Sequence, residues 1–169
     1  MSGDASTTLT TTTAEWRRVA SRARTLENSD AGKRLRELAR PRQIAYAWLR
    51  YHTGGDPIGV EFRHTAGPRW AFVAPNVTSQ WDQSPWRVQH FNESGFTLHT
   101  CHKDLQSAVE DMIGQGFHLL DPGVLDRLTI SPRWAMGVEQ SIQRDLFNQN
   151  RITLAQLVER LKEIEARHS

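Results

Sequence analysis

The stretch of sequence that decides the fold reads IGVEFRHTAGPRWAFVA over residues 58–74 and WRVQHFNESGFTLHT over residues 86–100. In each part, apolar and polar residues alternate with a period of two, which is typical of strands that have one buried face. Turn sequences at Thr65–Pro68 and Asn92–Gly95 divide each part into two. The sequence therefore predicts two consecutive β-hairpins, which form a four-stranded antiparallel sheet.

Helical patterns stand on both sides of these strands. Before them, apolar residues recur at helical spacing over residues 14–27 and 31–52, and Pro41 predicts a bend that divides the second stretch into two helices. After them, the same spacing recurs over residues 102–115, 131–148 and 154–167. The fold class is therefore predicted as α+β: N-terminal helices, a four-stranded antiparallel sheet of two hairpins, then three C-terminal helices.

Capping residues support several of these helix starts. Ser29 precedes the second helical stretch, Ser131 with Pro132 precedes residues 133–148, and Thr153 with Gln156 forms a capping box. The apolar seam of the last helix covers about two heptads, which is too short to predict a coiled coil. We expect this helix to pack on the sheet of its own domain, in a monomer or a weak dimer formed through this helix.

The length of 169 residues fits one domain with its own core. Residues 1–13 are polar and threonine-rich, and such a composition predicts a disordered leader. Residues 14–169 are then a single α+β domain. Because Gly54 and Gly55 form a flexible junction, residues 14–53 are alternatively a separately packed basic helical arm.

Composition excludes several classes of protein. Cys101 is the only cysteine, so neither a disulfide framework nor a cysteine-based zinc module is expected. No apolar run approaches the roughly 20 residues that span a bilayer, and the N-terminus lacks a secretory signal pattern. We expect a cytoplasmic protein with no membrane contact, and the arginine-rich, lysine-poor composition suits a bacterial or phage source.

Motifs for catalysis or metal binding are weak. The one cluster of suitable residue types is His99, Cys101 and His102, without a second cysteine or a spaced histidine pair after it. A hydrolytic enzyme at this cluster is the least supported class, and we predict no catalytic residue, metal ligand or cofactor. Glu110 and Asp111 are expected on the solvated face of a helix. His64 and His90 lie near hairpin turns and are expected to form an exposed polar pair.

Tryptophan points to a contact surface. Five of the six tryptophans fit apolar stripes, whereas Trp81 lies in the polar loop 75–85 without a periodic reason to be buried. An exposed tryptophan in a loop is a common contact residue in protein interfaces. The leading hypothesis is therefore a non-enzymatic protein-interaction module that regulates or inhibits a macromolecular partner. Its predicted partner-binding residues are Trp81, Gln80, Asp82 and Gln83.

The charge distribution supports an alternative. Residues 1–52 carry ten basic and five acidic side chains, a net charge of +5 in a chain whose total is +2. A basic helical segment can contact phosphates, so the second hypothesis is a nucleic-acid-binding accessory protein. A solvated helix face explains the same charges. The residues assigned to nucleic-acid binding are Arg17, Arg18, Arg22 and Arg24.

Overall fold

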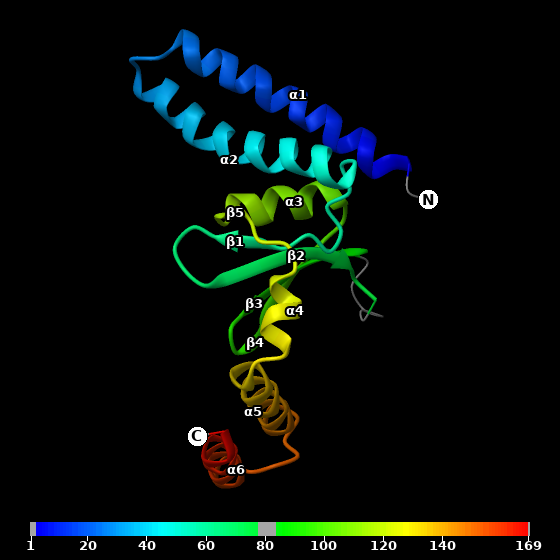
Figure 1. The fold of residues 1–169 in the computed structure, drawn as a ribbon, viewed down its shortest axis with the longest axis vertical. Helices are drawn as coiled ribbons and strands as arrows, with labels where there is room; N and C mark the ends of the chain where they lie inside the picture. Colours follow the sequence, from blue (N-terminus) through cyan, green and yellow to red (C-terminus); the bar gives the residue numbers. More distant parts are fainter. Residues whose placement is uncertain (1–2, 78–83, 169) are drawn as a thin grey trace.

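A central antiparallel sheet separates two groups of helices in the computed structural model, which describes residues 3–77 and 84–168, with side chains from Thr12 onward (Figure 1). Helices α1 and α2, which precede the strands, and α3, which lies between β4 and β5 in the sequence, lie on one face of the sheet. Helices α4, α5 and α6 lie beyond the other face, with the C-terminus at the far end of the molecule from α1. The α+β class is confirmed.

The sheet has five strands in the order β4-β3-β2-β1-β5, and all paired neighbours are antiparallel. Both predicted turns are present. The predicted count of four strands was one too low, because a short strand after α3 pairs with β1. The strands are β1 Phe62–His64, β2 Arg69–Pro75, β3 Trp86–Asn92, β4 Gly95–His102 and β5 Phe117–Leu120.

Strand β1 is shorter than the alternation over residues 58–63 predicts. Gly59 adopts a left-handed backbone with φ of 74°, which no extended strand allows. The residue before it, Ile58, makes only an isolated bridge to Val73. Regular pairing therefore begins at Phe62.

Helices α1 (Gly3–Thr25) and α2 (Asp30–Thr53) form an antiparallel hairpin. The prediction of two helices divided at Pro41 was wrong, since α2 continues through this proline. Packing along α1 holds the helix where intrinsic propensity alone would break it. Helix α1 also includes most of the segment predicted as a disordered leader. Thr12 and Thr13, at the C-terminal end of that segment, are buried.

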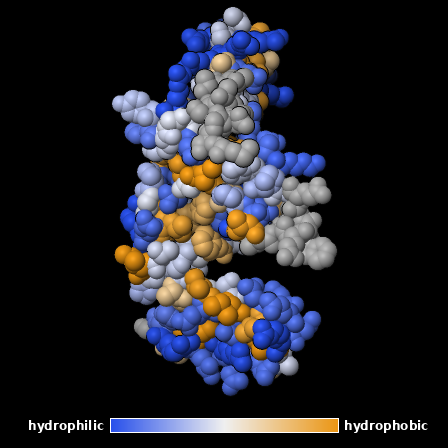
Figure 2. All heavy atoms as spheres, turned by 90° about the vertical axis from the view of Figure 1, so that its right-hand side faces the viewer, coloured by the Kyte–Doolittle hydropathy of each residue, from blue (hydrophilic) through white to orange (hydrophobic). Residues whose placement is uncertain are grey.

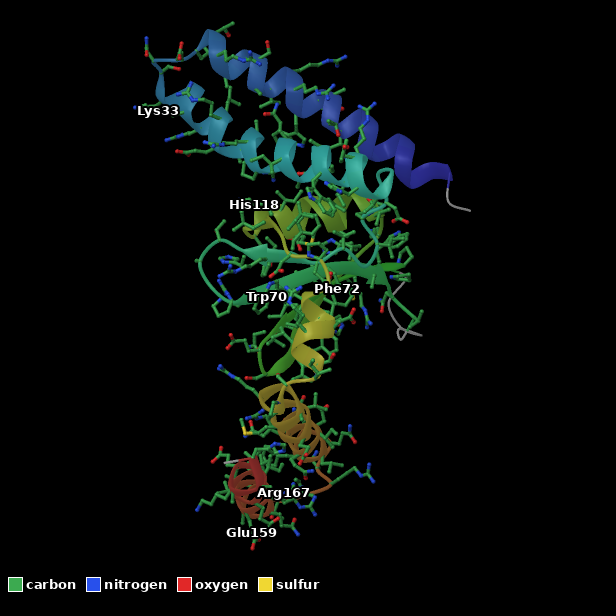
Figure 3. The ribbon with its side chains drawn as sticks, in the orientation of Figure 1. Lys33, Trp70, Phe72, His118, Glu159 and Arg167 are labelled. Carbon is green, nitrogen blue, oxygen red and sulfur yellow. The ribbon has the colours of Figure 1, made fainter. Side chains whose placement is uncertain are left out.

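Helix α3 (Leu105–Gly114) joins the α1–α2 hairpin to the sheet. Its apolar residues pack with Tyr46 and Leu49 of α2 and with Phe62, Val73 and Val88 of the sheet in one core. His118 of β5 lies between the sheet and α2 (Figure 3). We call this side of the sheet the α3 face.

The opposite side of the sheet, which we call the α5 face, carries a smaller core. It consists of Trp70, Phe91, Val124 of α4 (Val124–Thr129) and Trp134 of α5 (Pro132–Asn148). Gly137 of α5 lies so close to the β3–β4 turn that an added Cβ would stand 1.7 Å from the Ser94 carbonyl oxygen. Only glycine therefore lets α5 approach the sheet here.

Helix α6 (Leu154–His168) packs against α5, not against the sheet as the sequence analysis expected. Its capping box is confirmed, because Thr153 and Gln156 exchange hydrogen bonds between side chains and backbone. Leu157 and Ile164 are buried on the seam, whereas Leu154 and Val158 remain exposed. The Ser29 and Ser131 caps are confirmed as well. None of the helices in the described ranges is long and apolar enough to cross a membrane.

Candidate functional site

The outer edge of the sheet is formed by β4, which pairs with β3 on one side only. Its residues 96–99 are all exposed, and its sequence GFTLHTCH contains no lysine, arginine, acidic residue or proline. Natural sheets normally protect an exposed edge with charged side chains, prolines or short strands. The opposite edge has such protection, since β5 is four residues long and packs against α2. Strand β4 therefore leaves its outward hydrogen-bonding groups accessible over several residues.

A hollow of about 360 Å³ opens beside β4 on the α5 face. We call it the Arg87 pocket. Its walls include Phe72, Arg87, Gln89 and Phe96, with His99 at the edge strand. Phe72 projects from β2 toward this face, next to Trp70 (Figure 3). The Arg87 Nε atom is buried and lacks a hydrogen-bond partner within the described residues.

A second hollow, of about 330 Å³, opens beside the same part of β4 and reaches Gln115, the C-cap of α3, and Phe117, the first residue of β5. We call it the His90 pocket. Its polar lining residues are His64, Arg69, His90, Asn92, Thr97 and Gln115, and Leu98 of β4 stands at its rim. His64 and His90 both contact the ring of Phe117, at centroid distances of 4.9 and 5.0 Å. The two histidines therefore lie in one pocket rather than forming an exposed polar pair, and His90 is only 5% exposed.

The protonation of this pocket follows from its contacts. The Ala66 backbone N–H donates to His64 Nδ1 over 2.9 Å, so in the neutral ring the proton is on Nε2. Burial lowers the pKa of His90, and Arg69 acts in the same direction against the opposing charge of Asp111. The His90 Nε2 atom is buried without a hydrogen-bond partner among the described groups. Such an unsatisfied polar atom costs about 1–3 kcal/mol.

Both pockets share one electrostatic character. Each contains an arginine and at least one histidine, and neither lining contains a carboxylate. Arg69 contacts only the His64 ring, at 3.1 and 3.3 Å, and makes no ion pair in the part of the chain that the structure describes. Successive side chains of a strand point to opposite faces. A strand added alongside β4 would therefore present its side chains alternately to the two pockets.

The pairing of β3 with β4 contains one irregularity. Phe91 faces Phe96 and His90 faces Leu98, so Thr97 is an extra residue on β4. A bulge of this kind bends an edge and is also frequent beside functional sites. Pairing is regular from Leu98 to His102, and Gln89 Nε2 donates to the Leu98 carbonyl oxygen over 3.1 Å. Regular pairing therefore extends from Leu98 to the end of β4, and Leu98 and His99 are the exposed residues within it.

Comparison with protein-family models, with curated proteins and with solved structures finds no match for this chain. The function is therefore argued from the geometry of the molecule itself.

The predicted partner-binding residues lie outside the described residues. Gln80, Trp81, Asp82 and Gln83 all belong to the segment 78–83. The flanking residues are described: the Asn76 backbone N–H donates to the Pro85 carbonyl oxygen, and Asn76 Nδ2 lies 3.6 Å from Cys101 Sγ of β4. The described flanks of the predicted loop, Asn76 and Pro85, thus lie beside the C-terminal end of β4.

The cluster considered for hydrolysis does not come together. His99 and Cys101 face the α5 side, whereas His102 faces α3 and lies 3.2 Å from an Asp111 carboxylate oxygen. Within residues 12–77 and 84–168, no group of three or more histidine, cysteine or acidic side chains has the arrangement of a metal site.

The arginines assigned to nucleic-acid binding all lie on α1 and are exposed, and none makes an ion pair with a described residue. Arg24 also lines a groove between α1 and α2, together with Arg36 and Arg40. Arg36 is held in place because it donates to the Ala23 and Glu27 carbonyl oxygens. The four exposed arginines of α1 that were assigned to nucleic-acid binding are Arg17, Arg18, Arg22 and Arg24.

Glu110 was expected on a solvated helix face, and this expectation was wrong. Its carboxylate accepts hydrogen bonds from Trp16 Nε1 at 3.0 Å, from Arg42 Nε at 2.6 Å and from the Tyr46 hydroxyl. The Arg42 guanidinium also stacks over the Trp16 ring at 4.6 Å. The Glu110 side chain is 24% exposed and that of Arg42 13%. This carboxylate therefore fastens both helices of the hairpin to α3.

Sequence reasoning missed the edge of β4 and the His90 pocket. One signal was present: residues 95–102 lack Lys, Arg, Asp and Glu in a chain that is 24% charged. The pocket itself gave no signal, because it joins residues of β1, β2, β3 and β4 with the segment after α3.

Proposed function

We propose that this chain is a protein-interaction module that binds an extended segment of a partner protein by adding it as a strand to the outer edge of β4. The single observation that carries the proposal is the exposed, uncharged edge of β4 with a pocket on each of its two faces. In strand addition, main-chain hydrogen bonds supply affinity and pockets for alternate side chains supply specificity. The proposal refines the interaction module expected from the sequence.

Charge identifies the kind of segment. The two pockets present arginine and histidine and no carboxylate, so they suit a segment that carries acidic side chains. A second copy of β4 does not meet this requirement, since its sequence has histidines and no acidic residue. Apolar side chains of the partner segment also fit this edge, because they can pack on Phe96 and Leu98, which are 51% and 54% exposed. Figure 2 shows apolar residues around the middle of the molecule, below the polar α1–α2 hairpin, and a second group over the C-terminal helices.

Selection of displayed linear peptides of about 12 residues against the full chain tests this function. We expect selected peptides to carry acidic residues at neighbouring positions, because neighbouring side chains of a strand enter opposite pockets, and expect them to contact β4 when mapped by amide chemical shifts. Selection of peptides that contact only other surfaces would contradict the proposal. So would a chain that dimerises through β4 in sedimentation, because the edge would then be occupied by a second copy.

The α1–α2 hairpin supports a second candidate function, nucleic-acid binding. From Thr12 to Thr53 the chain carries ten basic and four acidic side chains, and only Lys33 and Arg42 of the basic ones form ion pairs among the described residues. Arginines that lack carboxylate partners are available to phosphates. The groove between α1 and α2 brings together Arg24, Arg36 and Arg40, with Glu37 as the acidic residue in its lining.

Replacing Arg17, Arg18, Arg22 and Arg24 with glutamine tests the second candidate. If the hairpin binds a DNA duplex of about 20 base pairs, affinity falls steeply with salt, with a log–log slope of about −0.9 per phosphate contact. The fourfold variant should then have a slope smaller by about 3.6 if each of the four arginines contacts one phosphate. Fluorescence anisotropy at about 50 to 200 mM salt measures it, with Arg127→Gln on α4 as a control outside the hairpin. A wild-type chain that shows no binding at the lowest salt would exclude this function.

A further inference from the structure

We propose that the His90 pocket is a carboxylate-binding site that receives an acidic side chain of the strand added at β4; this inference rests on the proposed function. The pocket lies beside Leu98, where the regular part of the accessible edge begins. It is therefore within reach of a side chain from a strand that pairs with Leu98 to His102.

The polar walls of the pocket are donors. Arg69 supplies a guanidinium, which holds a carboxylate through two parallel hydrogen bonds. Gln115 also lines the pocket, and its Nε2 donates to Asp111 Oδ2 over 2.8 Å. In the neutral His64 ring the proton is on Nε2, because Nδ1 accepts from the Ala66 N–H. No carboxylate lines the pocket, and Arg69 makes no ion pair among the described residues. The carboxylate that acts on His90 is that of Asp111, which Gln115 binds behind the pocket wall.

His90 gives the pocket an unmet hydrogen bond. Its ring is nine-tenths or more buried, with 5% exposed, and its Nε2 atom lacks a partner within the described part of the chain. In the neutral ring, an Nε2 that carries the proton can donate to a ligand oxygen. Burial lowers the pKa of His90, which favours its neutral form. His90 therefore contributes a hydrogen bond, whereas Arg69 contributes the positive charge.

The remaining walls fit the stem of an acidic side chain. Phe117 contacts both histidine rings, and Leu98 stands at the edge strand. A volume of about 330 Å³ accommodates a side chain of the size of glutamate. Apolar walls around a few convergent donors are typical of small specific sites.

Matched peptides test the inference. The probe is the tightest-binding selected peptide, with each acidic residue changed in turn to its amide counterpart. We expect one such change to weaken binding at least tenfold, and expect the same change to have no effect on the Arg69→Gln variant. Arg63→Gln, an exposed arginine of neighbouring β1, is the control and should keep the full discrimination.

The outcomes separate the inference from the function on which it rests. If peptides bind at β4 and every amide counterpart binds equally well, the carboxylate site is refuted and strand addition stands. If no peptide binds, strand addition is refuted. Titration with succinate, followed by the imidazole resonances of His64 and His90, then decides the pocket. Shifts that Arg69→Gln abolishes support a site for free carboxylates, and unchanged resonances overturn the site altogether.

Discussion

Replacing Glu110 with alanine should lower the free energy of unfolding by about 3 kcal/mol, the cost of removing one partner from a largely buried ion pair. The change leaves the Arg42 guanidinium, which is 13% exposed, without its carboxylate. It also removes the acceptor of the Trp16 and Tyr46 hydrogen bonds. Because these donors come from α1 and α2, the loss should loosen the hairpin before the sheet. Urea denaturation followed by tryptophan fluorescence measures the effect.

Glu163→Ala provides the matched control, because Glu163 is exposed on α6. Such a surface substitution should change stability by no more than about 0.5 kcal/mol. Tyr46→Phe removes a single donor and should cost about 1 kcal/mol. A Glu110→Ala variant as stable as the Glu163→Ala variant would show that this carboxylate does not fasten the hairpin to α3.

Replacing Leu98 with glutamate should weaken binding of an acidic peptide at least tenfold, or about 1.4 kcal/mol. The substitution removes an apolar side chain that is 54% exposed at the rim of the His90 pocket. It also places a negative charge on an edge that otherwise has none, which is how natural sheets prevent strand addition. The position is exposed, so the fold should remain intact. Fluorescence anisotropy with a selected peptide gives the affinity, and circular dichroism verifies the fold.

Leu119→Glu is the matched control for the other edge of the sheet. Leu119 of β5 is 46% exposed and pairs with Arg63, so glutamate is tolerated there. This variant should bind the peptide like the wild-type chain. If both variants lose affinity equally, charge alone weakens the complex and the edge of β4 has no special role.

The sheet was predictable because its signals are local. The alternation and the turn residues lie within the same 43 residues, 58–100. The observed strands β2, β3 and β4 agree closely with this pattern. Strand β5 was not predictable from local sequence. It is a strand because it pairs with β1, which lies more than 50 residues earlier in the chain. Helix α2 shows the same limit in reverse: Pro41 is a strong local signal for a break, and packing against α1 overrides it.

The candidate site was predictable only in part. Leu98 and His99 were recognised as strand residues, but β4 becomes the accessible edge because β5 covers the opposite side of the meander. Arg69, His90 and Gln115 meet only after the sheet and α3 have formed. The role of Glu110 was hidden for a similar reason, because an amphipathic pattern on α3 does not show which helix will pack on its polar side.

Hydrogen exchange of the β4 amides, measured by NMR with and without a saturating selected peptide, tests the central claim most directly. In the chain alone, the amides of Leu98 to Cys101 that point away from β3 should exchange rapidly. With the peptide bound, we expect the same amides to be protected at least tenfold, at every second residue, since strand addition bonds alternate residues. The amides of β5 should not change. Exchange rates in β4 that stay unaltered at saturation would contradict binding by strand addition.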